Sequence, residues 1–263
     1  MKKIINLLTD YQQLRLKYIQ KKLFPTANQR LELVREKIQR EKMIKFYGNF
    51  IKAGDLCFDV GANLGNRIEP FLSLSANVVA VEPQEACARF LRHKFNDQIE
   101  LEVVGLGESE GTKDFYIADT HTLSTFSSEW INTMKQHRFE GYNWRKPVKL
   151  TMTTLDKLIA RYGVPAFIKI DVEGYELNVL NGLSEPVQMI SFEYAVPEQT
   201  EKLIACIDRV SANKSTIECN FCVSETMEFA LPEWLTPNQM KTYIQTSEFS
   251  QTDFGDIYIR LKL

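Results

Sequence analysis

Hydrophobic and polar positions follow two different periods along the chain. In residues 2–20 and 27–47, apolar side chains recur every three or four residues with Lys and Arg between them. This spacing predicts two amphipathic helices, separated at Pro25. Further along, short runs of Val, Leu and Ile alternate with helical segments, which is typical of a parallel sheet covered by helices on both faces. We therefore expect N-terminal basic helices over 1–47 and an α/β domain over 48–263.

The elements of the α/β domain can be assigned from the same pattern. Residues 150–163 predict a strand end and a helix that stops at Gly163, and Thr236 and Pro237 predict the start of a helix. Residues 119–147 show no clear period and are rich in aromatic residues. Strands are predicted at 56–60, 77–82, 99–107, 113–118, 166–172, 187–194, 216–223 and 255–263. Further helices are predicted at 66–75, 84–96, 176–183, 197 to about 211, and 236–245.

Composition narrows the class of protein. A hydrophobic share of 44% and a charged share of 25% are those of an ordinary globular protein, and a net charge of −2 gives no reason to expect nucleic acid. No apolar run approaches the ~18 residues that span a bilayer, and the apolar stretch before Asp10 is too short for a signal peptide. Five cysteines, an odd number, predict reduced thiols and a cytoplasmic protein. Cys219 and Cys222 form a lone CxxC pair, so no zinc site is predicted.

The charge is distributed unevenly. Residues 1–47 contain twelve Lys or Arg and four Asp or Glu, a net +8, so residues 48–263 carry −10. The favoured interpretation of the basic helices is packing on the domain or homodimerisation, because such patterns usually reflect tertiary packing. The alternative is peripheral contact with an anionic membrane surface.

The segment DVGANLG, residues 59–65, lies between the first predicted strand of the domain and its first helix. In this type of sheet, ligands bind at the carboxyl ends of the strands. Gly61 and Gly65 allow the backbone to approach a ligand closely. The spacing differs from the dinucleotide motif G-x-G-x-x-G, because Ala62 and Asn63 follow the first glycine. This pattern favours a nucleoside ligand without a pyrophosphate, such as S-adenosylmethionine.

Acidic residues stand at the ends of two further strands. Glu82-Pro83 ends the second strand, twenty-three residues after Asp59, where a carboxylate can accept hydrogen bonds from both ribose hydroxyls. Strand alternation sends Lys169, Asp171 and Glu173 to one side of the sheet. Such charges are costly to bury unless they are paired or bind something. The alternatives are a ligand site at this strand end, or a Lys169–Asp171 ion pair with Glu173 at a helix start.

Together, DVGANLG, VVAVEP, TLDKL and FIKIDVEGYELNVLNGL resemble the FkbM-type methyltransferases over about residues 50–195. The resemblance implies a Rossmann-like class I methyltransferase fold with a mainly parallel seven-stranded sheet. It also implies transfer of a methyl group from S-adenosylmethionine to a hydroxyl group of a sugar, glycan or small molecule, with Asp171 and Glu173 where cofactor and acceptor meet. The residues expected to contact the cofactor are Asp59, Gly61, Ala62, Asn63, Gly65, Glu82, Pro83, Gly105 and Asp171.

Methylation of a hydroxyl requires a general base within hydrogen-bond reach. The candidate catalytic residues are Asp171, Glu173, His121 and Glu193. Our hypothesis is that Asp171 or Glu173 positions the acceptor and that His121 or Glu193 takes its proton. In an alternative, Asp171, Glu173 and Glu193 hold Mg²⁺, which would lower the pKa of the acceptor. The aromatic residues of 119–147 are interpreted as a segment that covers the substrate, or alternatively as an extension of the core.

Two other functions fit part of the pattern. A methyltransferase fold can keep its nucleoside site and act as a non-catalytic scaffold. An NAD-dependent oxidoreductase or epimerase can be built on a similar sheet, but the glycine spacing of residues 59–65 argues against it. The sequence does not identify the acceptor.

Overall fold

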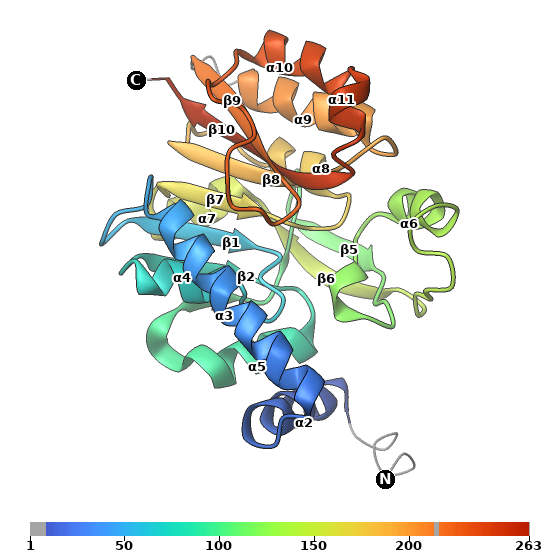
Figure 1. Ribbon diagram of the computed structural model, residues 1–263. Helices are drawn as coiled ribbons and strands as arrows, with labels where there is room; N and C mark the ends of the chain where they lie inside the picture. The colour runs from blue at the N-terminus through green and yellow to red at the C-terminus, as the bar shows by residue number, and fades with distance from the viewer. Residues whose placement is uncertain (1–8, 213–215, 263) are drawn as a thin grey trace.

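The computed structural model describes residues 9–212 and 216–262, and its centre is a seven-stranded sheet (Figure 1). The strand order is β3-β2-β1-β7-β8-β10-β9. Only β10 is antiparallel to its neighbours. The predicted mainly parallel seven-stranded Rossmann-like sheet is therefore confirmed. The strands are β1 Leu56–Val60, β2 Asn77–Val81, β3 Glu100–Glu102, β7 Phe167–Ile170, β8 Met189–Ala195, β9 Ile217–Val223 and β10 Phe254–Leu261.

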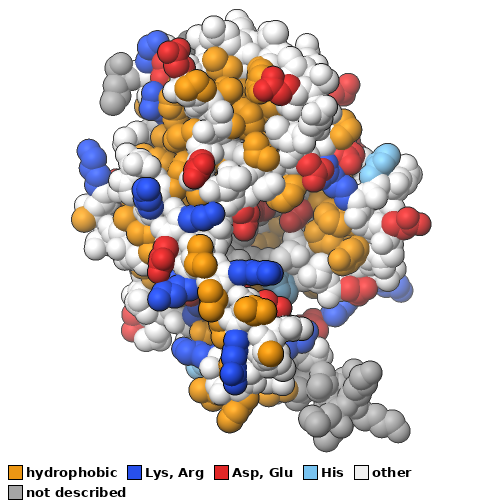
Figure 2. All heavy atoms as spheres, in the orientation of Figure 1, with side chains coloured by type: hydrophobic (Ala, Val, Ile, Leu, Met, Phe, Trp, Pro, Cys, Tyr) orange, Lys and Arg blue, Asp and Glu red, His pale blue; other side chains and the backbone are white. Residues whose placement is uncertain are grey.

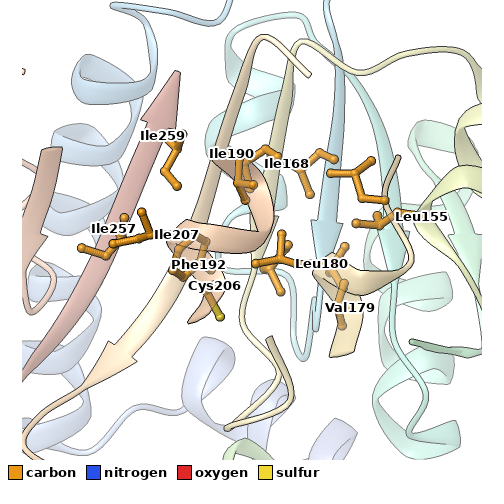
Figure 3. Packing of buried hydrophobic residues seen from close by; sticks show 14 of the residues in the cluster. Leu155, Ile168, Val179, Leu180, Ile190, Phe192, Cys206, Ile207, Ile257 and Ile259 are labelled. Carbon is orange, nitrogen blue, oxygen red and sulfur yellow. The ribbon is translucent and has the colours of Figure 1, made fainter. Parts of the chain in front are cut away.

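Each face of this sheet is covered by helices and has its own hydrophobic cluster. Side-chain alternation in β1 sends Phe58 and Val60 to one cluster and Cys57 to the other. Figure 3 shows the first cluster, where strand residues such as Ile168 and Ile190 meet residues of α7, α8 and α9. The second cluster joins the sheet to α4, to α5 and to the end of an N-terminal helix, α3 (Ala27–Tyr47). The helices of the domain are α4 Ile68–Ser73, α5 Glu85–Phe95, α7 Leu155–Tyr162, α8 Glu176–Asn181, α9 Thr200–Ser211, α10 Pro237–Ile244 and α11 Ser247–Ser250, with η1 Asn96–Gln98.

Helix ends with local signals were predicted well. The side chain of Thr236 accepts a hydrogen bond from the Gln239 amide, and Pro237 occupies the first turn, as expected for α10. Gly163 ends α7 with a positive φ of 99°. One prediction was wrong: Pro197 does not open a helix but lies in the turn before α9, which begins at Thr200.

Two helices precede the domain, α2 Asp10–Leu23 and α3 Ala27–Tyr47. The helix predicted at 27–47 is confirmed, and the described part of the helix predicted at 2–20 continues to Leu23. Its first apolar positions, Ile4, Leu7 and Leu8, lie outside the described residues. Only the end of α3 is buried, and α2 has no buried residue. Among the described helices, none combines the length and the apolar character needed to cross a bilayer.

A second, three-stranded sheet leads to a segment that covers one end of the main sheet. The strands are β4 Gly105–Leu106, β5 Gly111–Phe115 and β6 Val148–Thr153. The single strand predicted at 99–107 was wrong, because the chain leaves the main sheet after β3 and joins the small sheet as β4. Residues 116–147, which we call the cap segment, are more ordered than predicted: they contain η2 His121–Leu123 and α6 Ser128–Lys135, capped by the side chain of Ser127.

Candidate active site

The DVGANLG segment, residues 59–65, which we call the glycine loop, turns back at the carboxyl end of β1. The amides of Gly61 and Ala62 donate hydrogen bonds to the carbonyl of Val81, over 2.9 and 3.1 Å. Gly61 has a φ of +84°, and a Cβ at this position would collide with the carbonyl of Asp171. Only glycine therefore lets this loop lie against the end of β7.

Glu82 lies directly beneath this loop and is almost fully buried. Its carboxylate accepts hydrogen bonds from two backbone amides, those of Asn63 at 2.8 Å and Gln84 at 2.7 Å. Burial raises the pKa of Glu82 to about 7, although the two amides favour the charged form. The residue predicted to hold a ribose is thus fixed in place, with each oxygen receiving a single amide.

Asp59 and Lys169 are register partners in β1 and β7, so their side chains lie on the same face of the sheet. Asp59 is buried, and its Oδ2 atom has no hydrogen-bond partner among the described residues. Burial raises the pKa of Asp59 to about 7, against the opposing effect of Arg67 and Lys169. Both residues belong to the predicted site.

Lys169 is fully buried between two carboxylates. Its Nζ lies 2.9 Å from Oδ1 of Asp256 and 3.5 Å from Oδ2 of Asp171. Burial alone would lower the pKa of Lys169, but the two carboxylates outweigh it and hold the pKa above its usual value. The Lys169–Asp171 pair was one of the predicted alternatives, whereas Asp256 was missed because it stands alone in the last strand, β10.

The structure brings three of the four candidate catalytic residues together. Asp171, Glu173 and Glu193, which we call the acidic cluster, each offer a carboxylate oxygen, and these oxygens lie within 4.8 Å of one another. Burial, followed by the neighbouring carboxylates, raises the pKa values of Glu173 and Glu193 well above their usual range. Carboxylates crowded in this way favour protonation or a bound divalent cation, because either relieves the repulsion among them.

The loop that carries Glu173 is fixed from two sides. Glu176, at the start of α8, accepts hydrogen bonds from the amides of Val172 and Gly174. Thr125 of the cap segment donates to the carbonyl of Glu173, at 2.7 Å. Glu173 itself has a φ of +54°, which is unfavourable for a residue with a side chain. These contacts hold the acidic cluster in a backbone conformation that an isolated loop would rarely adopt.

His121, the fourth candidate, is held at the loop that follows β2 and lies outside the acidic cluster. Its carbonyl accepts a hydrogen bond from Nε2 of Gln84, at 2.9 Å, and Ser124 donates to the other end of the same amide. Its Nδ1 atom is buried without a partner among the described residues. Burial, with a smaller effect of Lys17, lowers the pKa of His121. Gln84, which joins the loop after Glu82 to the cap segment, was not predicted.

The other predicted cofactor residues have different surroundings. Ala62 and Gly65 are buried in the glycine loop, and Pro83 is half-buried between Glu82 and α5. Gly105 is buried in β4, where the space of a side chain is filled by the ring of Phe126 and by Met152. Packing in the small sheet therefore accounts for the glycine at this position.

The cap segment lies against the acidic cluster and leaves a hollow beside it. Trp130 is buried in a small core of the cap segment, against which Phe139 and Trp144 pack, whereas Phe126 is buried in the main core. Tyr142 is exposed. The hollow lies between α6, β8 and α9, and its polar lining consists of Glu176, Glu193, Gln199 and Lys202, with Trp130 among its apolar walls. Figure 2 shows Asp and Glu side chains gathered at the recess in the middle of the molecule.

The sequence matches a known family and a characterised relative. The family model described as "Methyltransferase FkbM domain" matches residues 59–211, which are 153 of the 263 residues. The hexuronic acid methyltransferase AglP of Haloferax volcanii is 30% identical over 149 residues, which are 52% of this chain and 54% of that protein. The chain thus spans about half the length of this curated relative.

Solved structures resemble the fold at low sequence identity. A precorrin-6y C5,15-methyltransferase from Geobacter metallireducens has a TM-score of 0.43 and 9% identity, with 85% of this chain and 87% of that chain covered. A TehB-like methyltransferase from Corynebacterium glutamicum has a TM-score of 0.43 and 10% identity, covering 84% and 88%. The class I methyltransferase fold of this protein is evident from the strand order itself. Strands β3, β2, β1, β7 and β8 are parallel, and β10 lies between β8 and β9 and is antiparallel to both.

Proposed function

The chain belongs to the FkbM methyltransferase family, and we propose that it is an S-adenosylmethionine-dependent O-methyltransferase that acts on a hydroxyl group of a sugar, glycan or small molecule. Residues 48–263 would form the catalytic domain. The observation that carries the proposal is the position of Glu82. Two backbone amides hold its buried carboxylate, and it lies beside the loop whose conformation requires glycine at position 61.

The residues at the carboxyl edge of β1 and β2 suit a nucleoside cofactor. Each oxygen of Glu82 receives one amide, so each retains a lone pair for one hydroxyl of a ribose. Gly61 lets the loop lie against the end of β7, and the buried Nδ1 of His121, which has no partner in the described part of the chain, would offer a polar group to the ligand. Asp59, Ala62, Asn63, Gly65 and Pro83 complete the proposed binding residues. S-adenosylmethionine, when bound, supplies a methyl group already activated on a sulfonium.

The acidic cluster supplies the acid–base chemistry of the proposal. Glu193 takes the proton of the acceptor hydroxyl, because its side chain lines the hollow and its raised pKa makes it a stronger base than an ordinary carboxylate. The carboxylate oxygens of Glu173 and Glu193 lie within 4.8 Å of each other, and, after burial, the charge of Glu173 contributes to the raised pKa of Glu193. Asp171 is fixed by Lys169 and orients the hydroxyl toward the cofactor side. The proton then leaves to solvent through the hollow.

A sugar acceptor is supported by the lining of the hollow and by the relative. Trp130 offers an apolar wall, while Gln199 and Lys202 offer hydrogen-bond donors. These are the groups that bind polyhydroxylated rings. The name of the relative, hexuronic acid methyltransferase, indicates that a related protein methylates an acidic sugar. Lys202 would favour an acceptor that carries a negative charge.

Calorimetric titration with S-adenosylhomocysteine tests the cofactor site directly. We expect micromolar binding, an at least tenfold weaker affinity in Glu82→Gln, and no change in the exposed control Glu233→Gln. NADH serves as the negative control. A folded protein that binds neither S-adenosylhomocysteine nor S-adenosylmethionine would overturn the proposal, and binding of NADH instead would favour an oxidoreductase.

Transfer of an isotopically labelled methyl group tests the activity. Labelled S-adenosylmethionine is incubated with a panel of neutral and acidic sugars, and alkali-stable label on a hydroxyl oxygen is the expected result. Cofactor binding without transfer to any hydroxylated acceptor in the panel would favour a non-catalytic scaffold.

A further inference from the structure

Exposed apolar side chains are concentrated on the two N-terminal helices. Twelve large hydrophobic side chains are exposed among the described residues, and eight of them belong to α2, α3 and the turn between them. These eight are Leu16, Tyr18, Ile19, Leu23, Phe24, Leu31, Val34 and Ile38. Exposed apolar side chains that gather on one part of a protein in this way are typical of an interaction site. Packing on the domain, one part of the favoured expectation, accounts for the end of α3 and for the side of α2 that contacts α5.

The apolar residues form one stripe on each helix. At 100° per residue, Leu31, Val34 and Ile38 lie within an arc of about 60° on α3. Leu16, Ile19 and Leu23 repeat the same spacing on α2.

A different side of α2 packs on the domain. There Tyr11 lies under the guanidinium of Arg89, at 4.5 Å, and Tyr18 contacts the ring of Phe90 on α5. At 100° per residue, the stripe of Leu16, Ile19 and Leu23 lies about 110–130° around the helix from these two residues, and it is exposed.

Basic side chains border the stripe of α3. By the same helical geometry, Arg35 and Lys42 lie on one side of it and Arg30 and Lys37 on the other. Arg30, Arg35 and Lys42 have no ion-pair partner in the described part of the chain. Figure 2 shows hydrophobic and Lys or Arg side chains next to each other over α3, the helix that lies in front in Figure 1.

The charge of this surface selects among partners. Residues 9–47 contain ten Lys or Arg and four Asp or Glu, a net charge of +6. If two copies met through this surface, two regions that each carry a net charge of +6 would face each other, and their repulsion disfavours self-association. An anionic lipid surface complements the charge and also accepts the apolar stripes below the level of its headgroups.

We propose that the helix pair α2–α3 binds the surface of an anionic lipid bilayer. The apolar stripes enter the interface, and the bordering Arg and Lys side chains contact lipid phosphates. The pair is connected to the candidate active site, because Asp10 at the start of α2 forms an ion pair with Arg145 of the cap segment, at 2.8 Å. The protein would thus be held at a membrane with its cap segment close to the lipid-binding helices.

Flotation of the full chain with vesicles tests this. We expect the protein to float with vesicles that contain phosphatidylglycerol, to float less at high salt, and to stay unbound with pure phosphatidylcholine. The triple variant Leu31→Ser/Val34→Ser/Ile38→Ser should lose at least tenfold in vesicle partitioning. Val164→Ser is the matched control, because Val164 and Val34 are both 56% exposed. Arg30→Gln and Arg35→Gln should each lower partitioning roughly fivefold.

Two results would overturn the proposal. One is failure of the full chain to float with anionic vesicles. The other is a concentration-dependent dimer, seen by sedimentation, that the triple variant converts to a monomer, which would assign the surface to a second copy of the chain. Titration of the same variants with S-adenosylhomocysteine separates this surface from the cofactor site, since we expect their affinity to be unchanged.

Discussion

At the scale of single residues, three carboxylates at neighbouring strand ends have three different environments. Glu82 rests on two backbone amides, Asp171 is paired with Lys169, and Asp59 keeps an oxygen without a partner among the described residues. The sequence predicted that these residues gather, because the carboxyl ends of parallel strands share an edge. It could not predict their environments, since Asp256, which pairs with Lys169, comes from the last strand.

Replacing Glu193 by Gln tests its role as the base. The amide keeps the size of the side chain but cannot accept a proton, so we expect kcat to fall by about 10²- to 10⁴-fold. Affinity for S-adenosylhomocysteine should stay the same, because Glu193 lines the hollow that we propose for the acceptor. Steady-state kinetics and calorimetry measure the two effects. A Glu193→Gln variant with unchanged turnover would exclude Glu193 as the base.

Metal removal is the control for this interpretation of the acidic cluster. Lys169 already neutralises part of its charge, and the raised pKa values of Glu173 and Glu193 allow a proton to neutralise more. We therefore expect activity to survive exhaustive treatment with EDTA. Loss of activity that Mg²⁺ restores would assign the three carboxylates to a divalent cation instead.

At the scale of elements, the cap segment is attached to its surroundings by two arginines of different kinds. Arg138 is mostly buried, forms a bidentate pair with Glu198 and donates to the carbonyls of Val196 and Asp253. Arg145 is largely exposed and forms an ion pair with Asp10 alone. Paired and partly buried charges contribute more than exposed ones, so Arg138 attaches this segment more strongly than Arg145 does.

The variant Arg138→Ala should therefore be the more damaging of the two. We expect it to lower the free energy of unfolding by about 2–3 kcal/mol, because it leaves Glu198 and two carbonyls without their donor. The KM for the acceptor should rise as well, since the cap segment forms a wall of the hollow. Arg145→Ala should change stability by less than about 1 kcal/mol. Urea denaturation measures both variants, and equal losses would contradict this ranking.

How well the elements were predicted depends on how local their signals are. The helix at 237–244 and the end of α7 at Gly163 were found from cap residues within a few positions. The division of residues 99–107 between two sheets was missed, because it depends on pairing of β4 with β6, more than forty residues later. Helix α6 was missed because its buried aromatic residue, Trp130, packs against Phe139 and Trp144 in the irregular chain that follows the helix, so no helical period marks the contact.

At the scale of the whole molecule, buried acids make the ligand-free fold sensitive to pH. Burial raises the pKa values of Asp59 and Glu82 to about 7 and that of Glu176 to about 6. In the unfolded chain these groups titrate near pH 4. A carboxyl group whose pKa is raised in the folded state stabilises the fold fully below the unfolded pKa, and this contribution is lost as the pH rises through the folded value. His121, with a lowered pKa, acts in the opposite direction.

We therefore expect the free energy of unfolding to fall by a few kcal/mol between about pH 5 and pH 7 and then to level off. The raised pKa values of Asp59, Glu82 and Glu176 all lower the stability as the pH rises, whereas the lowered pKa of His121 alone raises it. Saturating S-adenosylhomocysteine should reduce the fall, because ribose hydroxyls would donate to the ionised form of Glu82 and lower its pKa. Glu82→Gln should also reduce the fall, but without this response to the ligand. Chemical denaturation across this pH range measures the stability of the ligand-free protein, the ligand-bound protein and the variant. A stability of the ligand-free protein that rises from pH 5 to pH 7 would contradict the prediction, because it would show that these carboxylates are ionised in the folded protein at little cost.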